Sequence, residues 1–348
     1  MRKRTKNFYY GNVGIGSNFP ITVQSMTNTD TRDINKTIDQ IKSLEKVGCD
    51  IIRLAVPDMK AALALKDIKA NVNIPIIADI HFDYRLALQS IESGVDGLRI
   101  NPGNIGDSSR VRQIVEKCKE KDIPIRIGVN SGSIKKEFLD KYNGVNVDSM
   151  VESAMEHVRI LENMDFNKIV LSVKSTDIDM TLKSYEKLSE MVDYPLHIGI
   201  TESGSIWKGT IKSSIGIGAL LAKGIGDTIR VSLTGNPIEE VKVGKQILRS
   251  LGLLNDKIEV ISCPTCGRTR IDLESIVKEV EERIDYMDKP IKVAIMGCEV
   301  NGPGEAKEAD IGIAGGNGLG LIFKKGKIIK KVKEEALIEE LVKEINKL

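Results

Sequence analysis

The chain has 348 residues, and its 51 basic and 49 acidic side chains leave a formal net charge of +2, with only 4% aromatic residues. So balanced a charge and so few aromatic side chains argue against nucleic-acid binding, and no apolar run is long enough to cross a membrane. The five cysteines, an odd number in a chain of this length, argue against a disulfide framework and indicate the reducing environment of the cytoplasm.

Residues 21–250 repeat one pattern, in which a short apolar run leads through a polar or glycine-containing turn into an amphipathic stretch of helical period. Eight apolar runs follow it, at residues 21–27, 50–56, 75–81, 97–103, 124–130, 168–174, 196–202 and 228–234. Strands that alternate with helices indicate parallel βαβ units, and eight units in about 230 residues match a TIM (β/α)8 barrel. An open, doubly wound sheet is the alternative, but it does not require eight units. We therefore predict an α/β fold with a TIM-barrel domain over residues 1–252.

Polar and charged residues stand near the carboxyl ends of these runs, where the reactive groups of a TIM barrel lie. They are Arg53, Asp79, His81, Arg99, Asn101, Arg126, Asn130, Lys174, His197, Thr201, Glu202, Arg230 and Ser232. Four arginines and a lysine in otherwise apolar strands are costly to bury, and only Asp79 and Glu202 are evident counter-charges. A ligand with more than one phosphate would supply the missing negative charge. The alternative is that single arginines point outward and pair with acids on the helices.

Two of the three histidines, His81 and His197, stand at such strand ends. Each is a candidate hydrogen-bond donor or proton carrier, and each is equally a candidate for a structural bond to a neighbouring loop. His157 lies within a helical stretch, where a partly buried surface position is expected. The long connection 131–147 is either a lid or a surface turn, and the turn around Gly235 lies where TIM barrels often bind phosphate.

The barrel pattern ends near residues 251–257. The apolar runs and the final helical stretch beyond this point predict a small α+β domain, which we place at residues 253–348. Within it, the segment LIFKKGKII predicts a β-hairpin that turns at Gly326, and the glycine-rich residues 312–320 are interpreted as turns.

Three of the five cysteines lie in this second domain, near the ends of two apolar, strand-like runs. Cys263 and Cys266 form a CxxC step, and Cys298 opens the segment CEVNGPGE. Three thiolates are one short of a structural zinc site, so the spacing predicts a metal centre, zinc or an iron–sulfur cluster, with one unusual or exchangeable ligand. A redox dithiol is the alternative. Cys49 and Cys118 are expected to be buried, inert thiols.

Ten motifs occur in a characteristic order: VQSMT, RLAVP, ADIHFD, LRINPGN, IRIGVNSGS, SVKSTD, GITESG, RVSLTG, SCPTCGR and GCEVNGPGE. Through them, and over essentially its whole length, the chain resembles the hydroxymethylbutenyl diphosphate synthases of the non-mevalonate isoprenoid pathway, in their short two-domain form. The resemblance implies reductive ring opening and dehydration of 2-C-methyl-D-erythritol 2,4-cyclodiphosphate to 4-hydroxy-3-methylbut-2-enyl diphosphate. It also implies a 4Fe–4S cluster held by Cys263, Cys266, Cys298 and Glu305.

Under this resemblance the barrel binds the cyclic diphosphate and the cluster delivers two electrons, one at a time. The expected substrate-binding residues are Arg53, Arg99, Asn101, Arg126, Asn130, Lys174, Arg230 and Ser232. Glu202 and His81 are the candidates for proton delivery, and a salt-bridge role for Glu202 beside the arginines is the alternative. Asn301 is expected to hydrogen-bond near the cluster and to tune it.

The resemblance further implies a homodimer assembled head to tail, so that the cluster of one subunit serves the barrel of the other. Electrons are expected from flavodoxin or ferredoxin, because no flavin or nicotinamide motif is present. Two other functions remain open from the residues alone: a pterin- or corrinoid-handling TIM-barrel enzyme, and a module that uses its metal for structure or electron transfer. Neither requires both a cationic barrel mouth and three clustered thiols.

Overall fold

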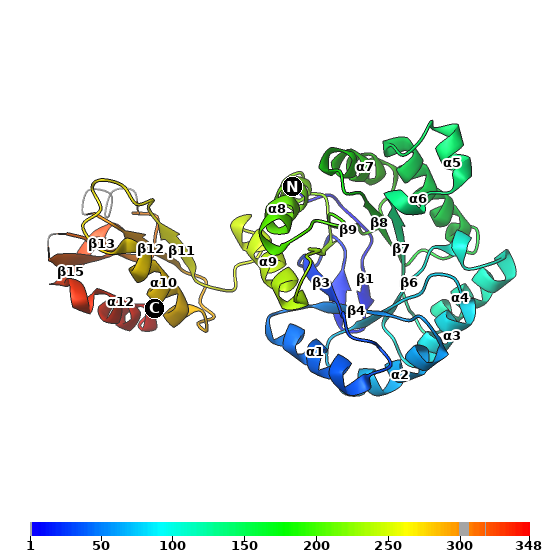
Figure 1. The fold of residues 1–348 in the computed structure, drawn as a ribbon, viewed down its shortest axis with the longest axis horizontal. Coiled ribbons are helices and arrows are strands. Elements are labelled where there is room, and N and C mark those ends of the chain that lie inside the picture. The colour runs from blue at the N-terminus through cyan, green and yellow to red at the C-terminus, as the bar shows by residue number, and fades with distance from the viewer. Residues whose placement is uncertain (1, 299–305, 317) are drawn as a thin grey trace. The chain divides into compact units, whose positions relative to one another are not determined.

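The computed structural model describes residues 2–298, 306–316 and 318–348. Contacts within the chain divide it into two compact units, Met1–Leu254 and Asn255–Leu348, called here the barrel unit and the small unit (Figure 1). Among the described residues, no helix is both long and apolar enough to span a membrane.

The barrel unit is built on eight parallel strands, one for each predicted apolar run. They are β3 (Thr22–Met26), β4 (Ile51–Ala55), β5 (Ile76–Asp79), β6 (Gly97–Arg99), β7 (Ile125–Asn130), β8 (Ile169–Lys174), β9 (His197–Ile198) and β10 (Thr228–Ile229). The strand order is β8-β7-β6-β5-β4-β3-β10-β9. A parallel bridge between Leu171 and Leu196 brings β8 and β9 together, and the Leu171 N–H donates to the Pro195 carbonyl at 2.9 Å. The predicted TIM barrel is confirmed, and its sheet is nearly closed.

Helices form a ring around these strands, as Figure 1 shows. They are α1 (Ile34–Lys46), α2 (Met59–Lys69), α3 (Tyr84–Glu92), α4 (Ser108–Glu120), α6 (Val147–Glu162), α7 (Ile178–Met191), α8 (Ile206–Ala222) and α9 (Pro237–Ser250), with the short α5 (Lys136–Lys141) in the connection after β7. Several begin at an aspartate whose carboxylate accepts a backbone N–H of the first turn, as Asp58 does from Ala61 at 2.9 Å. Each such cap starts a helix directly after a loop at the barrel mouth.

A short hairpin, which the sequence pattern does not predict, closes the amino-terminal end of the barrel. It consists of β1 (Phe8–Tyr10) and β2 (Val13–Ile15). Its Phe8, Tyr10 and Ile15 form a buried cluster with strand residues Ile51, Ile77 and Val170. In Figure 1, β1 lies across the centre of the strand ring. The reactive end of the barrel is therefore its opposite, carboxyl-terminal end.

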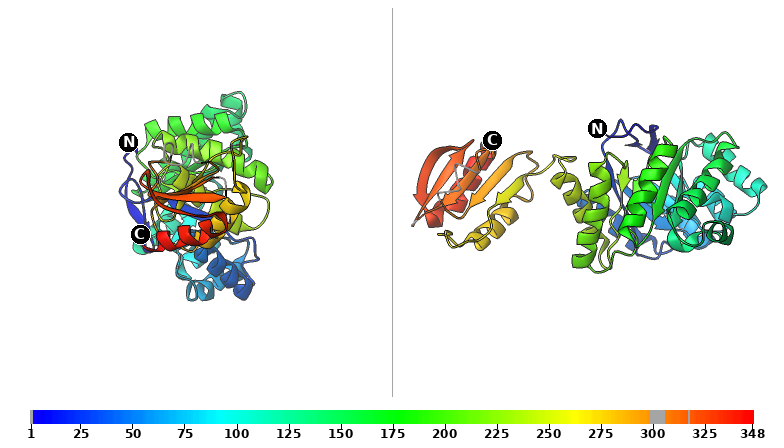
Figure 2. Two further views of the ribbon diagram at one scale, coloured as in Figure 1. Left: turned by 90° about the vertical axis from the view of Figure 1, so that its left-hand side faces the viewer. Right: turned by 90° about the horizontal axis from the view of Figure 1, so that it is seen from above.

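The small unit is a five-stranded mixed sheet with two helices on one face, as Figure 1 and Figure 2 show. Its elements are β11 (Glu259–Ser262), α10 (Leu273–Ile284), β12 (Lys292–Met296), β13 (Ile311–Gly315), β14 (Leu319–Lys324), β15 (Lys327–Lys333) and α12 (Leu337–Asn346). The strands follow the order β11 to β15, with β11, β12 and β13 parallel and the last two pairs antiparallel. The predicted α+β domain is confirmed.

Two local predictions in the small unit have different outcomes. The hairpin of β14 and β15 turns at Lys325 and Gly326, whose φ angles of 47° and 75° are those of a tight hairpin turn. The interpretation of residues 312–320 as turns is wrong, because most of them belong to β13 and β14. The glycines there make room for packing: a Cβ on Gly312 would lie 2.4 Å from the Phe323 ring.

Candidate functional site

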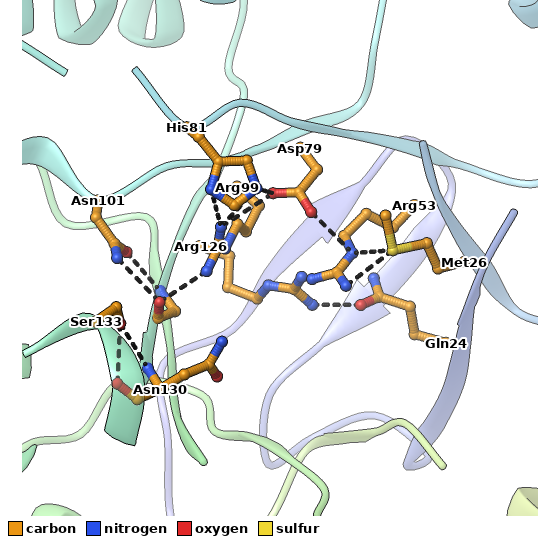
Figure 3. Close-up of polar contacts among 11 residues, drawn as sticks. Gln24, Met26, Arg53, Asp79, His81, Arg99, Asn101, Arg126, Asn130 and Ser133 are labelled. Carbon is orange, nitrogen blue, oxygen red and sulfur yellow. Dashed lines mark hydrogen bonds and ion pairs between the residues drawn. The ribbon is translucent and has the colours of Figure 1, made fainter. Parts of the chain in front are cut away.

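Five cationic side chains gather inside the barrel, each from a different strand or the residue that follows it. Arg99, Arg126 and Lys174 are buried, whereas Arg53 and Arg230 keep part of their surface exposed. Figure 3 shows three of these cations, Arg53, Arg99 and Arg126, close together with their polar partners. The structure brings the five cations close together inside the barrel, and their part in binding a substrate stays a prediction.

Asp79, the last residue of β5, is the negative centre of this group (Figure 3). Its two carboxylate oxygens lie 3.5 Å from Arg53 Nε and 3.2 Å from Arg99 Nη1. Burial by itself would raise the pKa of Asp79, but the charges of Arg53, Arg99 and Arg126 outweigh it and hold that pKa below its usual value. Asp79 is thus a carboxylate at neutral pH. His81, two residues later, is exposed, with its Nε2 3.7 Å from Asp79 Oδ1.

Arg126 reaches across the barrel interior rather than out of its mouth. Its side chain is only 2% exposed and donates through Nη1 to Gln24 of β3. Burial lowers its pKa to about 10, which still leaves the guanidinium charged at neutral pH. Its Nε is buried without a hydrogen-bond partner among the described residues. Gln24 is a contributor that sequence reasoning missed, because a single glutamine inside an apolar run carries no signal of its own.

Arg99 and Asn101 are held against the backbone of β7. Arg99 Nη2 donates to the Gly128 carbonyl at 2.8 Å, and the Asn101 amide both donates to that carbonyl and accepts the Gly128 N–H, each at 3.0 Å. A Cβ on residue 128 would lie 2.8 Å from Arg99 Nε, so glycine is what allows the guanidinium to lie over the strand. Both predicted residues are therefore oriented before any ligand binds.

Lys174 and His197 are two further buried polar residues of the barrel. No described residue forms a hydrogen bond or ion pair with the Lys174 ammonium, and burial, together with the charges of Arg126 and Arg230, holds its pKa well below the usual value. His197 begins β9 and is buried in the barrel, so its predicted place at the strand end is wrong. Its Nδ1 lies 3.4 Å from Thr228 Oγ1, and burial beside the cations holds its pKa far below neutrality. His197 is therefore an uncharged imidazole inside the barrel.

Arg230 has a counter-charge that the sequence did not indicate. Glu240, in the first turn of α9, is buried with a carboxylate oxygen 3.6 Å from Arg230 Nη2, and it also accepts the Leu233 N–H at 3.0 Å. The expectation that Asp79 and Glu202 are the counter-charges is thus only half right. Glu202 is exposed in the loop after β9, in a left-handed backbone conformation with a φ of 52°.

The remaining predicted residues lie at the rim. Asn130 ends β7 and is exposed, and its backbone carbonyl accepts the Ser133 hydroxyl at 2.9 Å. Ser232 is half-buried in the loop after β10. Five cations thus face two buried carboxylates, Asp79 and Glu240, which leaves a surplus of positive charge. Such a surplus is suited to a ligand with several negative charges.

The cysteines of the small unit follow two neighbouring parallel strands. Cys263 comes directly after β11, and Cys298 lies two residues after β12, whose Ile295 pairs with Ser262. The Gly297 N–H donates to Cys263 Sγ at 3.2 Å, so the two strand ends are in contact. A hydrogen bond from the Arg268 backbone lowers the pKa of the exposed Cys266 thiol.

Thiols at one sheet edge, with N–H groups directed at sulfur, are the donor chemistry that an iron–sulfur cluster requires. Within the described part of the chain, no three metal-binding side chains lie close enough together to hold an ion. The predicted fourth ligand Glu305 and the predicted tuning residue Asn301 fall outside the described residues. Cys49 and Cys118 are buried, as predicted, and burial raises the pKa of the Cys49 thiol to about 12.

Two family models match the chain. One is described as the GcpE TIM-barrel domain and matches residues 5–245, and the other, the GcpE protein C-terminal domain, matches residues 259–347. The chain belongs to the GcpE family. A family member from Clostridium perfringens, named 4-hydroxy-3-methylbut-2-en-1-yl diphosphate synthase (flavodoxin), is 63% identical over 98% of this chain and 98% of its own length. Relatives with the same name from Caldanaerobacter subterraneus and Bacillus cytotoxicus are 62% and 55% identical, over 100% and 99% of this chain and 98% and 94% of their own lengths. The resemblance stated from the motifs is confirmed.

Solved structures show the barrel fold of this family member in unrelated sequences. Dihydropteroate synthase from Stenotrophomonas maltophilia matches 71% of this chain and 97% of its own with a TM-score of 0.51 at 9% identity. 3-Dehydroquinate dehydratase from Geobacillus kaustophilus matches 72% of this chain and 99% of its own with a TM-score of 0.50 at 15% identity. At such identities the likeness concerns the fold alone, so the pterin-handling alternative gains nothing from it.

Proposed function

We propose that the chain catalyses the two-electron reductive ring opening and dehydration of 2-C-methyl-D-erythritol 2,4-cyclodiphosphate to 4-hydroxy-3-methylbut-2-enyl diphosphate. Sequence similarity over the full length to relatives named for that product supports the reaction. The observation that carries it is the surplus of buried cations at the barrel mouth, since a cyclic diphosphate brings the missing negative charge.

The barrel residues take different parts in binding. Arg53 and Arg230 keep 15% and 19% of their side chains exposed, so they can bond the diphosphate directly. We expect Arg99 and Lys174, which are buried, to contact the diphosphate from one side only. Arg126 is expected to act through its positive charge without direct contact. Asn101, Asn130 and Ser232 orient the substrate as hydrogen-bonding partners. Burial lowers the pKa of the Arg53 guanidinium, and the charge of Asp79 opposes this shift.

Protons for the leaving hydroxyl come from Glu202 or His81, both exposed at the mouth. The left-handed backbone at Glu202 costs free energy in a residue other than glycine, and such strain often marks a functional position. His81 lies beside Arg99 and Asp79, so it can pass a proton to a ligand bound there.

A 4Fe–4S cluster held by Cys263, Cys266, Cys298 and Glu305 is our proposal for the metal centre of the small unit. When bound, such a cluster supplies electrons singly and offers an iron with an exchangeable ligand. The Gly297 N–H on Cys263 Sγ would stabilise the thiolate form that iron binds. In this proposal, residues 1–252 form the substrate-binding domain and residues 253–348 the iron–sulfur domain.

Flavodoxin is the proposed electron donor, with ferredoxin as the alternative, and the cytoplasm the proposed location. We also propose a head-to-tail homodimer. Phe82, after β5, and Trp207, at the start of α8, are each 76% exposed in the barrel unit, and such large apolar side chains beside the mouth favour a covering partner. Light scattering of the purified chain tests the dimer.

Anaerobic purification followed by an electronic spectrum and a turnover assay tests the function. The expected protein is brown, contains about four iron atoms per chain and converts the cyclic diphosphate to the linear allylic product with a one-electron reductant. A brown protein without turnover would support the proposed cluster and contradict the proposed substrate. A colourless protein that stays inactive after cluster reconstitution would reject the mechanism.

A further inference from the structure

The last two strands of the small unit form a strongly basic hairpin. Residues 319–333, which comprise β14, β15 and their turn, contain six lysines and no acidic residue. The two helices on the sheet are acidic by comparison, with four acidic residues in α10 and three in α12 against three basic residues in total. Positive charge in this unit is therefore concentrated at one edge of the sheet.

The alternation of β15 divides its lysines between the two faces of the sheet. Val332 packs on the core beneath α10 and α12, and Lys330 forms an ion pair with Glu340 of α12, so both point toward the helices. Lys331 and Lys333, on either side of Val332, therefore point to the opposite face. Both are exposed and form no ion pair with another described residue.

On that opposite face the two lysines border an apolar surface. Lys331 pairs across the sheet with Leu321, and Lys333 pairs with Leu319, which is 52% exposed. Ile328, opposite Phe323, is 50% exposed on the same side. We call this surface the lysine-edged face, and it consists of Leu319, Leu321, Ile328, Lys331 and Lys333.

The lysine-edged face lies on the same side of the sheet as a candidate cluster ligand. Leu321 and Cys263 both pack against one buried cluster, which includes Met296 and Phe323. Strands in a sheet are about 4.8 Å apart, so β15 lies only some 14 Å from β12, the strand that leads to Cys298. A protein docked here would bring its redox group close to the thiols.

We propose that the lysine-edged face docks an acidic electron-carrier protein, an inference that rests on the proposed function. Transient redox complexes use small interfaces, in which an apolar centre is surrounded by charges that steer the partner. Each encounter oxidises the carrier by one electron and reduces the enzyme by one. Two encounters supply the two electrons that ring opening consumes, and the protons reach the substrate through Glu202 or His81, which regain them from solvent. The competing explanation is that the lysines only protect the edge strand β15 from pairing with other chains.

Charge reversal tests the proposal in the cluster-loaded, full-length enzyme. The K331E/K333E variant is compared with the wild type, with flavodoxin hydroquinone or with the viologen radical cation as reductant. At low ionic strength we expect kcat/KM for flavodoxin to fall by roughly tenfold or more, and added salt to reduce the difference. Turnover with viologen should stay unchanged, because a small reductant needs no docking surface. The matched control K42E/K60E reverses two exposed lysines on α1 and α2 and should change neither rate.

Other outcomes would overturn the proposal. Flavodoxin-driven rates that are equal in K331E/K333E and wild type would leave edge protection as the role of the lysines. An equal loss with both reductants, also seen in K331Q/K333Q, would place the lysines in the enzyme's own chemistry. A changed molecular mass by light scattering, with unchanged carrier kinetics, would assign the face to a second copy of the chain.

A binding titration separates this proposal from the proposed reaction. Oxidised flavodoxin, followed by its flavin fluorescence, is titrated with the cluster-loaded enzyme in the absence of the cyclic diphosphate. We expect a salt-sensitive complex that K331E/K333E weakens and K42E/K60E preserves, even if the wild type fails to open the cyclic diphosphate. Equal affinities for the three proteins would reject the docking surface, whatever the substrate proves to be.

Discussion

At the scale of single residues, the barrel mouth is a set of cations held ready by a few neutral and acidic partners. Asp79 and Glu240 each bond one or two cations, and Gln24 bonds the most deeply buried arginine. Orienting these side chains in advance lowers the entropy cost of binding a ligand. The cost is mutual repulsion of like charges, which a multiply charged anion relieves.

The first prediction at this scale concerns Arg230. Its replacement in Arg230→Gln removes a charged donor, which is typically worth about 1.5–3 kcal/mol, so KM for the cyclic diphosphate should rise about 10- to 100-fold. Steady-state kinetics with a viologen reductant measures it. Arg159→Gln, which removes an exposed arginine on α6, is the control and should leave KM unchanged. An unchanged KM in Arg230→Gln would remove this residue from the site.

The second prediction concerns His157, which is buried in α6, not partly exposed as expected. Its Nδ1 accepts the N–H of Gly103, which lies in the turn that follows Asn101, at 3.1 Å. Burial lowers the pKa of His157 from 6.5 to about 4. Between these values the unfolded chain binds more protons than the folded one. The free energy of unfolding should therefore be undiminished above pH 6.5 and fall by at most about 3 kcal/mol as the pH drops toward 4.

Urea unfolding at pH 7.5 and pH 5 measures this dependence, with the His157→Gln variant as control. Glutamine can still accept the Gly103 N–H but does not titrate. The variant should therefore lose less stability than the wild type between the two pH values. The same loss in both proteins would show that other groups cause the acid sensitivity.

At the scale of elements, glycines on neighbouring strands make room for two of the five cations, Arg99 and Lys174. Gly128 of β7 accommodates Arg99, and a Cβ on Gly199, just after β9, would lie 2.9 Å from Lys174 Nζ. A strand therefore contributes to the site through glycines, which leave room for a cation of the neighbouring strand, as well as through the side chains that it carries. The periodicity of an apolar run does not reveal this.

Gly128→Ala tests the role of this strand. The new methyl group would force Arg99 away from the Gly128 carbonyl and from Asp79, so KM should rise by about tenfold, the effect of losing one charged hydrogen bond. Gly218→Ala on α8 is the matched control, because its Cβ would meet nothing within 4 Å and alanine favours a helix. Equal kinetics in both variants would mean that Arg99 adapts without loss.

At the scale of the whole molecule, the two units have separate cores. The barrel cluster contains no residue of the small unit, whose own core lies between its sheet and its two helices. Separate cores can fold and unfold independently. A substitution that prevents cluster binding should therefore leave the barrel folded.

Cys298→Ser tests this independence. We expect loss of iron, brown colour and turnover, with the barrel's thermal transition and helical circular dichroism retained. Cys49→Ala, which removes a buried thiol of the barrel, should keep the iron. Full activity in Cys298→Ser would contradict the cluster mechanism, and loss of the barrel transition would contradict the independence of the two units.

Much of this architecture could be predicted because it follows from local patterns. Eight apolar runs separated by helical stretches imply eight strands, and the rule that parallel strands end at one edge brings Arg53, Asp79 and Arg99 together. The hairpin at Gly326 and the thiols after β11 and β12 follow from the same short-range patterns. These features depend on residues close together in the sequence, whose spacing carries the information.

The chain by itself thus determined the fold, the cationic mouth and the candidate cluster ligands. Only the tertiary structure decided that Gln24 and Glu240 are partners of Arg126 and Arg230, and that Lys331 and Lys333 share a side of the sheet with Cys263. Gln24 and Arg126 are 102 positions apart in the sequence. Arg230 and Glu240 are close in sequence but belong to a strand end and a helix, and the shared side of Lys331, Lys333 and Cys263 depends on the register of neighbouring strands. No local pattern encodes them, because they arise only when the barrel closes, the strands pair and the helices pack beside the strand ends.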